Sequence, residues 1–363
     1  MAATLETCLD DLAARIDEDE EQANRAAWID FLEDRCREEV FIPPARQPRP
    51  PKADWPTVSV NQAIRDPRAM LLQQFAGCSG AISGGSGARM NVRCNFGTGI
   101  MPSLFGCEVF MMDEQFNVLP TGVPLGSKDK VAALLDAGVP DVRGGLGGKV
   151  LEVAEMFMDA LAGRPVLGRN IEIYHPDVQG PMDAAEVVWG SDFFYAFYDA
   201  PDFLKRFLDL ITETYAAFMR AWFGLVGRPG TYATHWGMMF RGVLMIRNDS
   251  LMNLSPEAYA EFARPMDQRL FDEFGHAGGM HFCGRGDHYI AAMSRMEGLT
   301  AVAMSQPHLN DMETVYRNTV DKGIKLIGLR HDAARSAGRP LRGQVQCYPA
   351  AERVVFAHKR DVP

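Results

Sequence analysis

The chain has 363 residues, of which 47% are hydrophobic and 23% charged, as in an ordinary soluble globular protein. A formal net charge of −10, without a run of Lys or Arg, argues against a nucleic-acid binder. No apolar stretch approaches the roughly 20 residues of a membrane span, and the acidic N-terminus lacks signal-peptide features. Seven cysteines without a framework spacing fit free thiols in a reducing compartment, so we expect a cytoplasmic protein.

The first 56 residues predict a helical arm and a connector. Apolar residues recur at helical spacing over 3–40, with acidic residues between them. Prolines from Pro43 to Pro51 then end the helical pattern and favour a stiff, extended connector. We therefore divide the chain into an arm, 1–56, and a domain, 57–363. We expect the arm to pack outside the domain, with a homodimer as one arrangement that would cover its apolar face.

Two glycine-rich stretches, 78–87 and 144–149, lie in the first half of the domain. Neither is followed by the Gly-Lys-Ser/Thr sequence of a phosphate-binding loop. Both are predicted to be turns.

From Asn170 onward, predicted strands alternate with predicted helices. The strands are expected at 171–174, 231–236, 245–246, 279–283, 299–304, 324–329 and 343–347. Helices are expected to begin near Pro181, Pro201 and Pro256, because proline favours the first helical turn. This alternation is typical of parallel βα units, in which ligands bind at the carboxyl ends of the strands.

Two metal-ligating residues lie at the end of the predicted strand 279–283. His281 and Cys283 are two positions apart and therefore point to one face of the strand. An imidazole and a thiol are good ligands for zinc. If the fold brings the end of strand 343–347 close, Cys347 completes a three-ligand site with one open position, as in catalytic zinc sites. The alternative is that both cysteines are ordinary buried thiols and His281 is a core histidine.

Four segments resemble, in order, segments of the uroporphyrinogen decarboxylase superfamily, in its zinc-dependent, cobalamin-linked methyltransferase branch. They are a Gly-Pro helix entry at 179–183, an Asp- and Pro-containing helix start at 197–204, an acidic position with a Ser-Pro helix at 248–257, and His281-x-Cys283-Gly284 with the distant Cys347. The resemblance covers about residues 90–350. It implies an α/β fold, a (β/α)8 TIM barrel preceded by an N-terminal helical extension.

The chain departs from the superfamily in two places. The acidic pair is Asn248-Asp249 here, which leaves one carboxylate, and the arginine-rich substrate loop of the true decarboxylases is replaced by the proline-rich connector. The resemblance therefore implies a methyltransferase rather than a decarboxylase. It implies Zn²⁺ held by His281, Cys283 and Cys347, and a methyl group moved between a corrinoid protein and a small acceptor such as a thiol or tetrahydrofolate. Because the chain has no Asp-x-His-x-x-Gly cobalamin-binding motif, methylcobalamin would be supplied by a separate protein.

Five further residues are candidates for the site. Tyr174, His175 and His235 end predicted strands, the first two as substrate contacts and His235 as a catalytic residue. Asp249 is predicted to orient His281 or to accept a proton, and Arg285 to bind an anionic substrate group. The alternatives are that the aromatic and histidine residues pack in the core, that Asp249 is a solvated loop acid, and that Arg285 forms a surface ion pair.

Two other functions remain open at this point. The same zinc ion would serve as a Lewis acid in a lyase or decarboxylase-like enzyme acting on a small molecule. A non-catalytic barrel that binds a tetrapyrrole or corrinoid is the third hypothesis, although a pure binding protein has no use for an open metal site.

Overall fold

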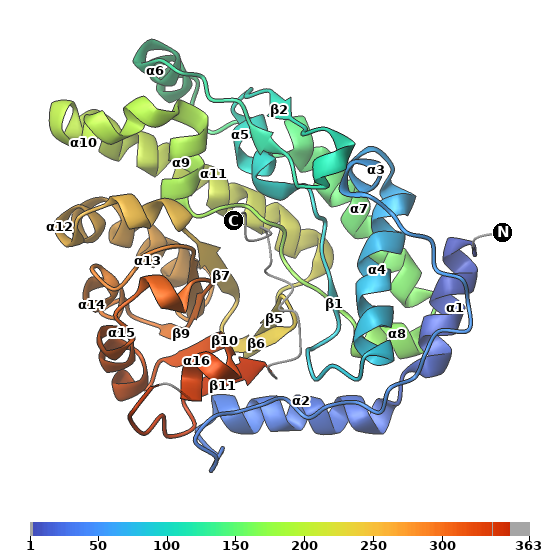
Figure 1. Ribbon diagram of the computed structural model, residues 1–363. Helices are drawn as coiled ribbons and strands as arrows, with labels where there is room; N and C mark the ends of the chain where they lie inside the picture. Colours follow the sequence, from blue (N-terminus) through green and yellow to red (C-terminus); the bar gives the residue numbers. More distant parts are fainter. Residues whose placement is uncertain (1–2, 336, 349–363) are drawn as a thin grey trace.

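The computed structural model describes residues 3–335 and 337–348 as an α/β fold in which helices lie around a central group of strands (Figure 1). Five parallel strands form one sheet in the order β11–β10–β9–β8–β7. A second parallel pair joins β1 to β4, and two antiparallel hairpins join β2 to β3 and β5 to β6. The strands are β1 Asn91–Val92, β2 Val109–Phe110, β3 Thr121–Gly122, β4 Glu172–Ile173, β5 Tyr232–His235, β6 Met238–Arg241, β7 Leu244–Arg247, β8 Gly278–Phe282, β9 Leu299–Met304, β10 Lys325–Arg330 and β11 Val345–Tyr348.

The helices cover the outer side of these strands through apolar faces. In α11, buried residues recur at the spacing of a helix turn from Leu204 to Trp222, so one side of this long helix faces the core. Pro201 occupies its first turn, where its missing N–H costs no hydrogen bond. The α-helices are α1 Leu5–Arg15, α2 Glu18–Leu32, α3 Val60–Arg65, α4 Pro67–Ser83, α5 Ile100–Leu104, α6 Lys128–Ala137, α7 Gly145–Ala162, α8 Pro165–Asn170, α9 Pro181–Trp189, α10 Ala196–Asp199, α11 Pro201–Val226, α12 Pro256–Ala258, α13 Arg264–Glu273, α14 Ile290–Met293, α15 Met312–Asn318 and α16 His331–Arg335.

The hairpin β5–β6 lies on the inner face of the five-stranded sheet, the face on which α2 also packs. Its two-residue turn, Trp236-Gly237, has positive φ at both positions, which is the backbone of a type I′ turn. Side chains of β6 pack against the inner side of β8 and β9. These side chains belong to a cluster of buried hydrophobic residues that we call the inner core. Its buried members are Trp28, Phe31, Leu32, Phe41, Ala233, Met238, Met239, Phe240, Met245, Ala301, Ala303, Ile327 and Tyr348.

The N-terminal arm completes the inner core. Trp28 and Phe31 of α2 are fully buried in it, and the ring centroids of Trp28 and Phe41 are 5.0 Å apart. Beyond α2 the chain is extended, and Phe41 forms a parallel bridge with Gln346 of β11. The arm is therefore helical as predicted, and its apolar face is covered by the rest of the chain. The division at residue 56 and a homodimer stay predictions.

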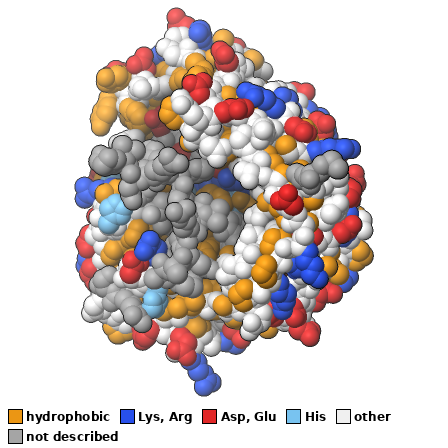
Figure 2. Space-filling model, turned by 45° about the vertical axis from the view of Figure 1, so that its right-hand side comes forward, with side chains coloured by type: hydrophobic (Ala, Val, Ile, Leu, Met, Phe, Trp, Pro, Cys, Tyr) orange, Lys and Arg blue, Asp and Glu red, His pale blue; other side chains and the backbone are white. Residues whose placement is uncertain are grey.

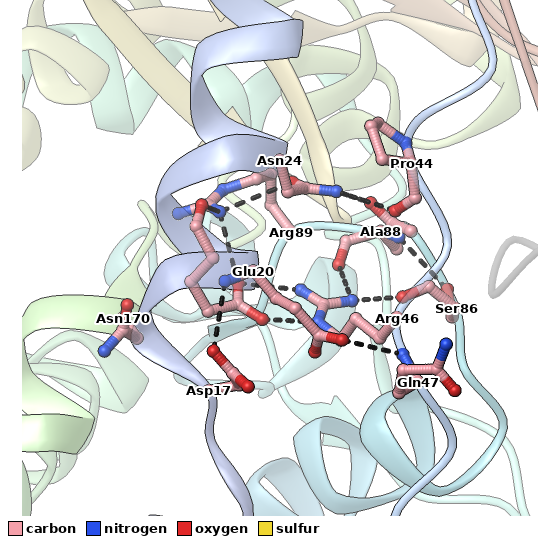
Figure 3. Close-up of polar contacts among 12 residues, drawn as sticks. Asp17, Glu20, Asn24, Pro44, Arg46, Gln47, Ser86, Ala88, Arg89 and Asn170 are labelled. Carbon is pink, nitrogen blue, oxygen red and sulfur yellow. Dashed lines mark hydrogen bonds and ion pairs between the residues drawn. The ribbon is translucent and has the colours of Figure 1, made fainter.

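A buried ion-pair network fixes the arm to the loop after α4 (Figure 3). The guanidinium of Arg46 pairs with Glu21 of α2 and donates to the backbone carbonyls of Ser86 and Ala88. Arg89 donates to the same carboxylate at 3.3 Å. Because both arginines and Glu21 are almost completely buried, separating the arm would leave uncompensated charges in the core.

The prediction of an α/β fold with parallel strands is confirmed. Among the described residues the parallel strands belong to two separate sheets, so a closed (β/α)8 TIM barrel stays a prediction. The turn predictions for the glycine-rich stretches are partly wrong, because α4 extends to Ser83 and α7 begins at Gly145. In the described part of the chain, no helix combines the length and the apolar character needed to cross a bilayer. Acidic and basic side chains of these residues are interspersed over the face in Figure 2.

Candidate metal centre

Three side chains with metal-ligating atoms converge at the carboxyl ends of β7 and β8. His281 lies near the end of β8, Cys283 follows that strand, and Asp249 follows β7. Their ligand atoms all lie within 4.8 Å of one another. The thiol Sγ of Cys283 is 3.5 Å from Nε2 of His281, and Oδ1 of Asp249 is 3.9 Å from the same nitrogen. The group contains His281 and Cys283, which were predicted as metal ligands, and Asp249, which was predicted to orient His281 or to accept a proton.

The alternation of β8 places His281 and Cys283 together. Met280 and Phe282 are fully buried in the large core on the helix side of the sheet. His281 therefore points to the inner face, where its partner in β9 is Ala303 of the inner core. Cys283 is two residues after His281, so the alternation places it on the same inner face.

The Cys283 and His281 donor atoms are spaced as two ligands of a zinc ion. Tetrahedral zinc with bonds of about 2.3 Å to sulfur and about 2.0 Å to nitrogen separates these two ligands by about 3.5 Å. The distance from Cys283 Sγ to His281 Nε2 has this value. In a Cys–His–Asp catalytic triad, the thiol and the carboxylate would contact different ring nitrogens. Here both approach Nε2, which is the geometry of three donors around one point.

Backbone hydrogen bonds fix the two loops that carry the donors. The N–H of Cys283 donates to Oδ1 of Asp249 at 2.7 Å, and the Cys283 thiol donates to Ser305 Oγ at 3.3 Å. The N–H groups of Asp249 and Ser250 each donate to the carboxyl group of Asp183 at 2.7 Å. Asp183 of α9 therefore holds the loop after β7 in place without contacting the donor point itself.

Burial determines the protonation of the site. It lowers the pKa of His281 to about 4, although Asp249 acts in the opposite direction, so the imidazole is neutral at neutral pH. The neutral imidazole is the form that ligates a metal. Burial first, and the charge of Asp249 second, raise the pKa of Cys283 to about 12. The thiol therefore keeps its proton until a cation displaces it.

The side chain of Asn248, the residue before Asp249, points to a different partner. Its Nδ2 donates to both carboxyl oxygens of Asp267, at 2.9 and 3.0 Å. Burial raises the pKa of Asp267 to about 8, while the Asn248 hydrogen bond lowers it. Gly180 lies against this amide, because a Cβ there would be 2.2 Å from Asn248 Oδ1. Asn248 thus links the loop after β7 to α9 and α13.

The structure does not bring Cys347 to the donor group. Cys347 is fully buried in the large core on the helix side of the sheet and pairs with Leu329, which lies in the same core. Its neighbour Tyr348 belongs to the inner core. Because adjacent residues of a strand point to opposite faces, Cys347 points away from the face of His281. The predicted third ligand is therefore replaced in this geometry by Asp249.

Tyr174, His175 and His235 form an aromatic group at the inner end of the hairpin. The ring of His235 lies 4.6 Å from those of Tyr174 and His175 and 4.3 Å from that of Trp236, between centroids. Nδ1 of His175 donates to Pro176 O at 3.0 Å, and its Nε2 accepts from the Met245 N–H at 3.1 Å. All three side chains are buried and packed against one another, as the alternative of packing in the core proposes.

Arg285 lies on the surface rather than beside the donors. Its side chain is 63% exposed and donates to Asp287 at 2.7 Å. The surface ion-pair alternative describes this contact.

The sequence-based prediction missed three residues near the donor group, Arg93, Asp177 and Arg247, whereas Trp236 was considered there together with His235 as a substrate contact. Arg247 ends β7 and pairs in register with His281, and Arg93 directly follows β1. The ring of Trp236 contacts both Arg247 and His281: it lies 4.7 Å from the His281 ring and 5.1 Å from the Arg247 guanidinium. The signal that would have found the arginines is a charged residue directly at the end of an apolar strand.

Comparisons with known proteins identify a similar fold. No protein-family model matches the chain, and no curated protein matches it. Among solved structures, a methyltransferase from Methanosarcina mazei superposes with a TM-score of 0.61 at 16% sequence identity, over 91% of this chain and 93% of that chain. At this identity the similarity establishes a shared fold over nearly the whole length.

Proposed function

We propose that this chain is a zinc-dependent methyltransferase whose metal is held by Asp249, His281 and Cys283. The observation that carries the proposal is the convergence of these three donors on one point at the carboxyl ends of β7 and β8. Ligand sites of parallel βα folds lie at that end of the strands. The fold shared with a methyltransferase supports this reaction class.

A bound zinc ion would supply an open coordination position and lower the pKa of a thiol that enters it. The residues of the chain provide the conditions for this. Neutral His281 offers Nε2, while Cys283, after losing its proton, and Asp249 each provide one negative charge. These two charges balance Zn²⁺, and a neutral site accepts an anionic thiolate more readily than a negative one. Ser305 and the Cys283 N–H hold the thiol and the carboxylate in position.

We further propose that the methyl donor is methylcobalamin on a separate corrinoid protein and that the acceptor is a small thiol or tetrahydrofolate, as the sequence resemblance implies. With a thiol acceptor, the sulfur would form the new bond to the methyl carbon, and the electron pair of the cobalt–carbon bond would stay on cobalt. The Cys283 thiol contributes to this reaction as a ligand and not as the nucleophile.

Methyl transfer from methylcobalamin to a panel of thiols and to tetrahydrofolate tests the proposal directly. We expect zinc-loaded protein to be active and His281→Ala and Cys283→Ala to be inactive, with Cys347→Ala as the matched cysteine control that stays active. Equal rates for the four proteins would overturn the proposal. Zinc-loaded protein that binds thiols at the metal but transfers no methyl group would favour the Lewis-acid lyase.

A further inference from the structure

A surface hollow lies between α6, the end of α9 and α10, at the rim of the molecule (Figure 1). Its volume of about 260 Å³ is close to the lower end of the range for small-molecule sites, roughly 300–1,000 Å³. Asp183, near the start of α9, contacts the loop of Asp249, whereas Trp189 ends the helix, so the hollow and the metal centre lie at opposite ends of α9. The lining residues of the hollow are Lys128, Trp189, Asp192, Tyr195, Ala196, Asp199 and Ala200.

The hollow contains two carboxylates without a protein counter-ion. Asp192 and Asp199 are exposed, and within residues 3–335 and 337–348 neither side chain forms an ion pair or a hydrogen bond. Lys128 is the cation of the lining, but its ammonium group lies over the ring of Phe203, 5.1 Å from the centroid. Two carboxylates and one ammonium leave the hollow with one excess negative charge, which favours a cationic ligand.

Two aromatic side chains border the hollow. Tyr195 is 68% exposed and offers its ring to a ligand, whereas Trp189 is only 2% exposed and forms the inner end. The rings of Phe193, Phe203 and Phe207 hold Trp189 edge-on, at centroid distances of 6.2, 5.6 and 5.9 Å. The indole N–H of Trp189 is buried and has no acceptor in the described part of the chain. Because buried donors are normally satisfied, an acceptor atom of a ligand would complete the hydrogen bonding at this end.

We infer that this hollow binds a small arylalkylamine, with its ammonium group at Asp192 and Asp199 and a neutral hydrogen-bond acceptor beside Trp189. The two carboxylates supply the opposite charge, and the face of the Tyr195 ring attracts a cation. A carboxylate or phosphate ligand would instead be repelled by the excess negative charge. The inference goes beyond the proposed function and does not depend on it.

Binding of a matched pair of phenols tests the inference. Tyramine carries an ammonium group where tyrosol carries a hydroxyl group, and calorimetric titration at constant ionic strength compares them. We expect tyramine to bind at least about fivefold more tightly, because exposed ion pairs and a cation–π contact each contribute modestly. Asp192→Asn and Asp199→Asn should each reduce this preference about twofold or more, without changing the affinity for tyrosol. Asp159→Asn, at an exposed carboxylate of α7 outside the hollow, is the matched control and should retain the full preference.

Two further variants test the other walls of the hollow. Lys128→Gln removes the internal cation, so the affinity for tyramine should rise while that for tyrosol stays the same. Trp189→Phe keeps an aromatic ring but lacks the N–H. Phenethylamine, which lacks the phenol oxygen, separates the lost hydrogen bond from lost packing. The advantage of tyramine over phenethylamine should therefore disappear in Trp189→Phe, and an unchanged advantage would overturn the placement of the acceptor at Trp189.

Equal affinity of the normal protein for tyramine and tyrosol would overturn the site. A preference that survives in the double variant Asp192→Asn/Asp199→Asn would also overturn it. The same holds if Asp159→Asn reduces the preference as much as the lining variants do. The cation would then respond to the net charge of −10 and not to the hollow.

Discussion

The thiol of Cys283 lies 3.5 Å from Nε2 of His281, on the inner face at the end of β8. Asp249 approaches the same nitrogen from the neighbouring loop. Strand alternation accounts for the first contact, and the pairing of β7 with β8 accounts for the second. The site therefore depends on two adjacent parallel strands rather than on a long-range contact with β11.

The two cysteines at strand ends should differ in their effect on metal binding. Cys283→Ala removes a donor atom and should lower zinc affinity by at least about tenfold. Cys347→Ala removes a sulfur from the core on the other face and should leave zinc content unchanged, with a modest loss of stability. Metal analysis after dialysis against a weak chelator measures the difference. Parallel loss of zinc from both variants would show that Cys347 is a ligand.

Asp249→Asn tests the carboxylate as a charged donor. The amide oxygen can still accept the Cys283 N–H, so the loop should keep its conformation. The negative charge is lost, and we expect zinc affinity to fall about 10- to 100-fold with little change in thermal unfolding. Competition with a chromophoric chelator gives the affinity, and calorimetry gives the unfolding temperature. Unchanged zinc affinity would show that Asp249 only holds the loop in place and does not bind the metal.

The arm should be required for folding. Trp28→Ala empties part of the inner core, and the loss of a buried Trp should cost about 3–5 kcal/mol. Tyr198→Ala, at a residue that is 86% exposed, is the aromatic control and should change stability by no more than about 0.5 kcal/mol. Urea unfolding measures both. If the two variants unfold alike, the arm does not belong to the core.

His175 should make stability depend on pH. Burial lowers its pKa from the ordinary 6.5 to about 3, so the unfolded chain binds a proton more readily than the folded chain. The contribution of neutral His175 to the free energy of unfolding is complete above pH 6.5 and is lost as the pH falls toward 3. At pH 5 the loss is about 2 kcal/mol. We expect His175→Gln to lack this component, so the difference between the two urea-unfolding free energies should change by that amount between pH 7 and pH 5. Curves that stay parallel would contradict this assignment.

Much of the strand pattern was predictable because buried strands are short apolar runs bounded by turns. The prediction 299–304 coincides with β9, and the starts of α9, α11 and α12 lie at the predicted prolines. β6 was missed because its turn, Trp236-Gly237, lacks the Asn-Gly or Asp-Gly sequence typical of a type I′ hairpin.

The glycines at 144–149 were predicted as a turn, but they begin α7. Gly147 is required there by packing, since a Cβ would be 2.0 Å from Val142 O.

The face on which Cys347 lies was not predictable from its position at a strand end. A shift of one residue in strand register moves a side chain to the opposite face. The pairing of β10 with β11 contains such an irregularity between Leu326 and Leu329. His281 and Cys283 were predictable because their relation is local, within one strand. Arg93, Asp177 and Arg247 come together only through the arrangement of β1, β4 and β7.

X-ray absorption at the zinc edge of the loaded protein tests the central claim most directly, because it counts the sulfur ligands. We expect one sulfur at about 2.3 Å and nitrogen or oxygen neighbours at about 2.0–2.2 Å, from His281, Asp249 and an exchangeable ligand. Addition of 3-mercaptopropionate should raise the sulfur count from one to two. Two sulfurs before the thiol is added would restore Cys347 as a ligand. A shell without sulfur would contradict the assignment of Cys283 and, with it, the proposed metal centre.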